Sequence, residues 1–87
     1  MKKIYTIHDS KGGFYLELSY FRSNGEAMRA FETTVRDPKS QFHLYPGDFT
    51  LIHLGEFDSD TSSISLLENP SILANGSDYK DQPAIQG

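Results

Sequence analysis

Apolar and polar positions alternate with a period of two near the start of the chain, which is typical of half-buried β-strands. Residues 3–8 are β-branched or aromatic at nearly every position, and residues 9–13 have the glycine-rich composition of a turn. Residues 14–21 then alternate, and their expected core-facing set is Phe14, Leu16, Leu18 and Tyr20. Tyr15 and Phe21 would face outward. The two segments together predict an antiparallel hairpin.

Helical spacing replaces the alternation in the next segment. Ser23 and Glu26 fit a capping box, in which the serine hydroxyl accepts a hydrogen bond from the amide of the third helical residue while the glutamate reaches back. The apolar stripe that follows is Ala27, Ala30, Phe31, Thr34 and Val35. Asp37 and Pro38 end the helix, because the residue before a proline is pushed out of the α region.

The second half of the chain predicts another hairpin. Residues 49–57 form a strand with apolar side chains on both sides, which favours a central strand or one covered on both faces. Residues 58–62 are a turn, and residues 64–67 return as the last strand. We expect Phe31 and Val35 of the helix to pack on this sheet. Their expected partners are Leu16, Leu18, Leu51 and Ile52.

Shorter segments complete the predicted fold. Residues 41–45 are expected to form a short strand, an Asn-Pro pair at residues 69–70 breaks the last strand, and residues 71–75 could form one helical turn. The prediction is a single small α+β domain over residues 1–76, with one amphipathic helix on a mostly antiparallel β-sheet in the order ββαβββ. Residues 77–87 carry few large apolar groups and are expected to be a flexible C-terminal tail.

Composition narrows the class of protein. The 87 residues contain no cysteine, so neither a disulfide framework nor a thiolate metal site is expected. No apolar run approaches the roughly 20 residues that span a bilayer, so no membrane association is expected. The start is basic and then apolar, but Thr6, His8 and Asp9 interrupt it too early for a signal peptide. We expect a protein that stays in the cytoplasm where it is made.

The net charge of −4 hides an asymmetry. Residues 1–45 carry seven Lys or Arg against five Asp or Glu, a balance of +2, whereas residues 46–87 carry one Lys against seven acids, a balance of −6. Nucleic acids respond to local positive fields, so the negative net charge of the chain argues against nucleic-acid binding without excluding it. Ordinary solvated surface charge is the alternative explanation.

The motifs of catalysis and metal binding are missing from the sequence. His8, His43 and His53 have no spacing typical of a zinc site. The acidic turn after residue 57 begins like a calcium loop, but Ser63 and Asn69 stand where that loop needs glycine and glutamate. No phosphate-binding loop and no nucleophile elbow are present. We therefore expect no metal, no cofactor and no enzymatic activity.

Aromatic residues are the enriched class, with six Phe and five Tyr. Exposed rings beside basic groups are how proteins hold single-stranded nucleic acid, because bases stack on the rings while cations follow the phosphates. The candidate nucleic-acid-binding residues are Lys3, Lys11, Tyr15, Phe21, Arg22, Arg29 and Arg36. The alternative is that Tyr15 and Phe21 pack beneath the helix or against a partner subunit.

Several short motifs, taken in order, resemble the small nonstructural protein of gokushovirus-type microviruses, which are tailless bacteriophages with single-stranded DNA. The resemblance runs from Lys3 to about Tyr79. Its pieces are residues 3–9, the Ala-x-Arg-Ala-Phe helix at residues 27–31, Asp37-Pro38, Tyr-Pro-Gly-Asp-Phe at 45–49, Leu-Gly-Glu-Phe-Asp at 54–58 and Asn69-Pro70. It implies a role in single-stranded DNA binding or in switching genome synthesis towards packaging, and it carries over no catalytic residues.

These observations lead to a functional hypothesis. We expect a nonstructural accessory protein of a phage, acting in the cytoplasm of the infected bacterium on single-stranded viral DNA during replication or packaging. The alternative is a protein–protein adaptor whose acidic second half binds a basic replication or capsid protein. We also expect a homodimer, because one helix cannot cover both faces of the sheet. The monomeric alternative folds Ile72 and Leu73 back over the second face.

Overall fold

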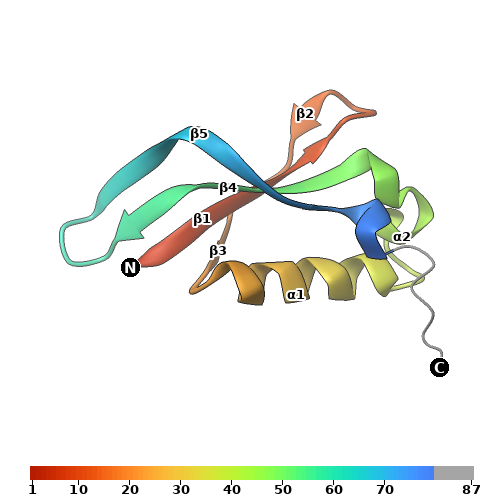
Figure 1. Ribbon diagram of the computed structural model, residues 1–87, viewed down its shortest axis with the longest axis horizontal. Helices are drawn as coiled ribbons and strands as arrows, with labels where there is room; N and C mark the ends of the chain where they lie inside the picture. Colours follow the sequence, from red (N-terminus) through yellow and green to blue (C-terminus); the bar gives the residue numbers. More distant parts are fainter. Residues whose placement is uncertain (80–87) are drawn as a thin grey trace.

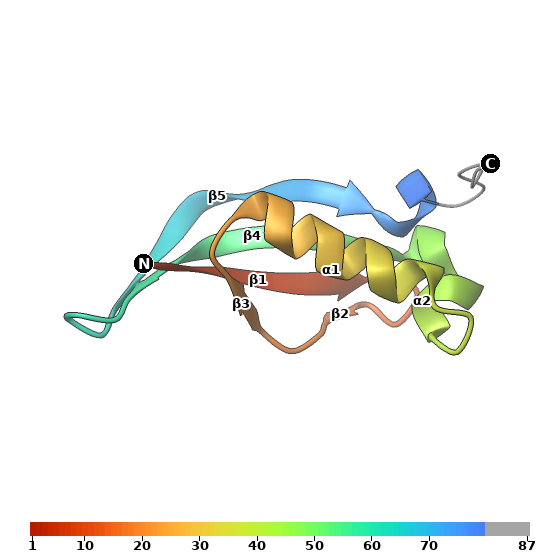
Figure 2. The same cartoon turned by 90° about the horizontal axis from the view of Figure 1, so that it is seen from below.

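One long helix lies along one face of a twisted antiparallel sheet (Figures 1 and 2). The computed structural model describes residues 1–79. Its elements are β1 (Lys2–Asp9), β2 (Phe14–Tyr15), β3 (Ser19–Phe21), α1 (Asn24–Arg36), α2 (Gln41–Leu44), the 3-10 turn η1 (Pro46–Asp48), β4 (Phe49–Asp58), β5 (Ser63–Asn75) and the 3-10 turn η2 (Gly76–Tyr79). The predicted α+β class with one main helix is confirmed.

The predicted first hairpin is present, but its second arm is interrupted. Strands β2 and β3 both pair antiparallel with β1, in the registers His8 opposite Tyr15 and Ile4 opposite Tyr20. Between them the chain leaves regular pairing, and the Thr6 hydroxyl donates a hydrogen bond of 2.8 Å to the Leu16 carbonyl oxygen. The expected single strand over residues 14–21 is therefore two short strands joined by an arch.

Strands β4 and β5 form the second hairpin, and β4 also pairs with β1 to give the sheet order β2-β1-β4-β5. The Asp58 carboxylate accepts a hydrogen bond of 2.9 Å from the Asp60 amide in the turn, as expected for an acidic turn. Strand β5 continues past Pro70, although its pairing with β4 is irregular between His53 and Gly55. The predicted helical turn at residues 71–75 is wrong, because these residues find strand partners along β4.

A helical segment replaces the short strand expected at residues 41–45. Ser40 caps α2, its hydroxyl accepting a hydrogen bond of 3.0 Å from the Phe42 amide. Pro46 then begins η1, a position where its missing N–H costs nothing. The Phe42 ring stacks on Phe49 with 4.3 Å between ring centroids. The cap and this aromatic contact favour the helical turn over a strand that would have no partner.

The core lies between α1 and the sheet. Its buried members are Tyr5, Ala27, Phe31, Val35, Phe49, Leu51 and Ala74. The expected packing of Phe31 and Val35 with Leu51 is confirmed, and Leu16 packs at the margin of the same cluster. Leu18 is exposed, and Ile52 lies on the strand side opposite Leu51, so these two of the four expected partners are wrong.

The arch between β2 and β3 also changes which side chains face the core. Phe21 packs edge-on against Tyr5 at 5.7 Å, whereas Phe14 and Tyr20 are half exposed. The predicted alternation over residues 14–21 is therefore inverted at its end. At the other end of the domain, the Tyr79 ring packs on Phe31 at 6.1 Å, two residues beyond the expected start of a tail. The rest of that predicted tail, residues 80–87, lies outside the described residues.

Candidate functional site

The two faces of the sheet differ sharply. Helix α1 covers the face that carries Tyr5 and Leu51 (Figure 2), and these two side chains are the largest fully buried ones in the described chain. We call the opposite side of the sheet the open face. Large apolar side chains remain exposed on it: Tyr15, Leu18, Tyr20, Ile64, Leu66 and Ile72. Since soluble monomers rarely expose many such groups together, the open face is a candidate binding surface.

Tyr15 is the candidate ring that the open face presents most directly. Its residue is 63% exposed, and its ring lies 4.6 Å from that of His8 on the neighbouring strand. Lys11 stands in the exposed turn between β1 and β2, next to the same pair of strands. A Tyr-His stack with a nearby lysine can hold a flat ring and a phosphate at the same time.

The three candidate arginines belong to the other side of the molecule. Arg29 and Arg36 lie on α1, and Arg22 precedes it, so the sheet separates them from Tyr15. The Arg36 guanidinium pairs with Glu32 at 2.8 Å, one helical turn earlier. Arg22 pairs with Glu26 at 3.1 Å, although its own side chain is largely exposed.

Glu26 connects the helix cap to this arginine. The Glu26 amide donates to the Ser23 hydroxyl at 3.1 Å, which confirms the predicted N-cap, but its carboxylate accepts from the Arg22 amide at 2.9 Å. This backbone hydrogen bond, and then the hydrogen bond from the Arg22 side chain, hold the pKa of Glu26 below its usual value. The carboxylate therefore stays charged and offsets part of the positive field at the start of α1.

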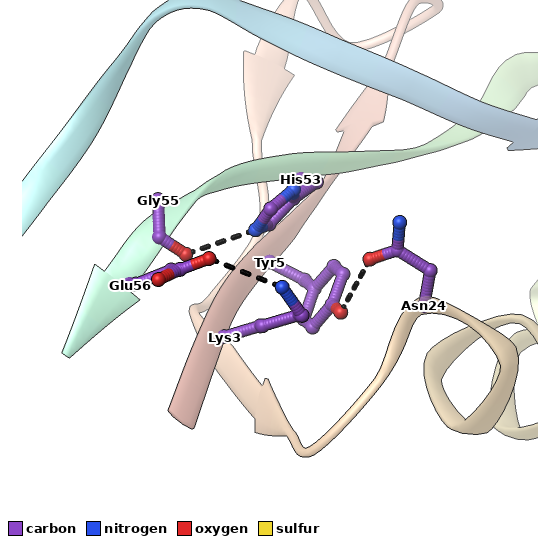
Figure 3. Close-up of polar contacts among 6 residues, drawn as sticks. All are labelled: Lys3, Tyr5, Asn24, His53, Gly55 and Glu56. Carbon is purple, nitrogen blue, oxygen red and sulfur yellow. Dashed lines mark hydrogen bonds and ion pairs between the residues drawn. The ribbon is translucent and has the colours of Figure 1, made fainter. Parts of the chain in front are cut away.

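Lys3 and Phe21 are the candidates that the structure turns towards the α1 side. The Lys3 ammonium pairs with the Glu56 carboxylate at 3.1 Å, because the two residues are opposite one another in β1 and β4 (Figure 3). Phe21 packs on the buried Tyr5, so its predicted outward position is wrong. The seven candidates are thus not gathered on one surface: Tyr15 lies on the open face, Lys11 lies in the turn that precedes β2, and the other five lie elsewhere.

A polar cluster around the buried Tyr5 joins β1, α1 and β4 (Figure 3). The Tyr5 hydroxyl donates to the Asn24 side-chain oxygen at 2.8 Å, and the Tyr5 ring lies 5.1 Å from the ring of His53. His53 Nε2 donates to the Gly55 carbonyl oxygen at 3.0 Å. Burial, and then the negative charges of Glu26 and Glu56, raise the pKa of Tyr5. This cluster fixes β1 against α1 and β4, and we assign it a structural role.

The open face also holds a groove of about 500 Å³ that the sequence did not reveal. We call it the apolar groove. Its lining residues are Lys2, Ile4, Leu18, Tyr20, Leu54, Phe57, Ile64 and Leu66. They come from four strands and the arch, so no local pattern brings them together. The signal that could have found them is the apolar character of both sides of residues 49–57.

Within residues 1–79, no three His, Asp or Glu side chains are grouped so that they could hold a metal ion. The histidines instead have separate packing roles, for example His43, whose ring Nδ1 donates to the Val35 carbonyl oxygen at 3.0 Å. In the same part of the chain, no helix has the length and apolar character that crossing a membrane would require.

Two comparisons with known proteins both match the chain to phage ORF5 proteins. The sequence profile of a family described as "Phage ORF5 protein" matches residues 2–79. Protein ORF5 of Chlamydia phage 1 is 38% identical over 60 residues, which cover 64% of this chain and 62% of that protein. The chain therefore matches less than two thirds of the length of this curated relative. No solved structure matches the chain.

Proposed function

Because the chain belongs to the phage ORF5 protein family, we propose that it is a non-enzymatic accessory protein that binds single-stranded viral DNA in the cytoplasm of the host bacterium, during replication or packaging. The resemblance to a small microvirus protein agrees with the match to the Chlamydia phage protein. The observation that carries the proposal is the exposed Tyr15 ring on a sheet face that α1 leaves open.

The chemistry of the Tyr15 region fits an unpaired base. Single-strand-binding proteins use aromatic side chains on an open sheet as platforms for stacking, and each stacked base contributes about 1–3 kcal/mol. His8 supports the ring from the neighbouring strand, which limits the rotamer freedom lost on binding. Lys11, in the exposed turn that precedes β2, supplies a cation for the phosphate backbone. The binding site is therefore smaller than the set of seven residues that the sequence suggested.

Fluorescence anisotropy with a labelled oligonucleotide tests the proposal. At low salt we expect micromolar binding that weakens with salt by a log–log slope of about −0.7 for each phosphate neutralised. Tyr15→Ala should weaken binding by about 5- to 150-fold, which corresponds to the loss of one stacked base. Tyr45→Ala is the matched control, because Tyr45 is also 63% exposed but lies between α2 and η1.

Two outcomes would contradict DNA binding at this site. Absence of binding at low salt and about 20 µM protein would reject it and favour the adaptor, in which the acidic second half binds a basic viral protein. Equal weakening by Tyr15→Ala and Tyr45→Ala would show that Tyr15 has no special role. Circular dichroism of both variants confirms that they remain folded.

A further inference from the structure

We propose that the apolar groove is the contact surface for a second copy of this chain, so that two sheets pack face to face about a two-fold axis. This proposal does not depend on DNA binding. The groove lies over the start of β1, at Lys2 and Ile4, whereas Tyr15 stands opposite His8 near the end of that strand. Tyr15 is not among the residues that line the groove.

The exposed area on the open face matches what a dimer requires. Leu18, Tyr20, Ile64 and Leu66 of the groove, with Ile72 on the same face, are each between 52% and 72% exposed. At roughly 100 Å² for each large apolar side chain, the five present about 500 Å². A stable dimer of standard size buries about 800 Å² per partner, of which about 60%, or roughly 500 Å², is apolar.

The charge of the groove favours a copy of the same chain over a charged partner. Lys2 is the single ionisable lining residue apart from the phenol of Tyr20, and Lys2 lies at the start of β1. A nucleic acid would need several cations there, and a basic protein would need carboxylates. A two-fold contact packs one surface against its own copy, so a surface with almost no charge can associate with itself without burying an unpaired charge. The apolar groove meets that condition.

No part of the described chain covers the groove. Ile72, which the monomeric alternative would fold over the second face, is instead held in β5 opposite Ile52 and is 72% exposed. The described chain ends at Tyr79, whose ring packs on Phe31 on the α1 side of the sheet.

The size of the domain gives a thermodynamic reason for association. A chain of 87 residues buries a modest core, and its main cluster here lies between α1 and the sheet. Covering the open face with a second sheet gives each protomer the second apolar layer that its strands β4 and β5 lack. Two packed sheets stand about 10 Å apart, which is a distance that leucine, isoleucine and tyrosine side chains fill.

Sedimentation equilibrium over a dilution series from about 1 mM tests the dimer. We expect a mass that rises from 9.8 kDa towards twice that value as concentration increases. Leu66→Glu places a charge in the contact and should raise the dissociation constant at least about 100-fold. Leu44→Glu is the matched control: Leu44 is 64% exposed and Leu66 is 70% exposed, but Leu44 lies in α2, and its variant should dimerise like the wild type.

A crosslinking experiment locates the contact without introducing a charge. The chain has no cysteine, so a single Leu66→Cys substitution carries the molecule's sole thiol. A flexible bismaleimide long enough to span the contact should link two Leu66→Cys chains efficiently and two Leu44→Cys chains poorly, because Leu66 lines the groove whereas Leu44 lies on α2. A mass of 9.8 kDa at every concentration would overturn the proposal. An unaltered dimer in Leu66→Glu, or equal crosslinking of the two cysteine variants, would also overturn it, because the copies would then meet elsewhere.

Discussion

Removal of the Phe31 ring tests whether α1 is held to the sheet as the structure indicates. The residue is 3% exposed, and its ring lies 6.0 Å from Phe42 and 6.1 Å from Tyr79. Burial of about 150 Å² of ring at 25 cal/mol/Å², less what alanine retains, contributes about 3 kcal/mol. The two aromatic contacts add about 1 kcal/mol. Phe31→Ala should therefore lower the free energy of unfolding by about 4 kcal/mol, within the usual range for this substitution.

Such a loss is large for this chain. At about 0.05–0.15 kcal/mol per residue, 87 residues give a total stability of about 4–13 kcal/mol. We expect the melting temperature of Phe31→Ala, followed by far-ultraviolet circular dichroism, to fall by at least about 15 °C or the variant to be unfolded. Phe14→Ala is the matched control, because Phe14 is 52% exposed and should shift the midpoint by only a few degrees. A melting temperature for Phe31→Ala within about 4 °C of the wild type would refute the packing.

Two further predictions concern the backbone and the buried phenol. A Cβ at Gly55 would collide with the Ser65 carbonyl oxygen and lie 2.8 Å from the Leu66 Cα. Gly55→Ala should therefore lower the free energy of unfolding, measured with denaturant, by about 2 kcal/mol or more. Gly47→Ala is the control: its Cβ would have open space around it, and it should lower that free energy by less than about 1 kcal/mol. The pKa of Tyr5 is raised in the folded chain, so its contribution to stability is complete below about pH 10 and is lost as the pH rises through the folded value. Tyr5→Phe should reduce the alkaline fall of the melting temperature, and identical pH profiles would contradict this.

Local patterns predicted the elements that depend on near neighbours. The helix follows from Ser23, from the spacing of Phe31 and Val35 and from the stop before Pro38, all of which act within a few residues. The segment at residues 41–45 was misread because alternation in so short a run does not distinguish a strand from a capped turn. The contact that decided it, Phe42 on Phe49, requires that the chain has already folded back.

Local sequence patterns also predicted only part of the candidate site. The exposure of Tyr15 was predicted from alternation, but the partial burial of Phe21 was not, since the strand is interrupted between β2 and β3. Lys3 was expected to bind phosphate, yet the register of β1 and β4 places Glu56 opposite it. Pairing of this kind is set by long-range strand order, which a single sequence does not reveal.

The irregular pairing of β5 has a consequence for aggregation. This strand forms the edge of the sheet, and an exposed edge is a template on which further chains can add. Regular pairing with β4 covers residues 63–66 and resumes at Ser71, with Pro70 between these two stretches. Pro70 has no N–H to donate and fixes its own φ, so it interrupts the free edge of β5 near the middle of the strand. This interruption opposes the open-ended addition of further chains along the edge.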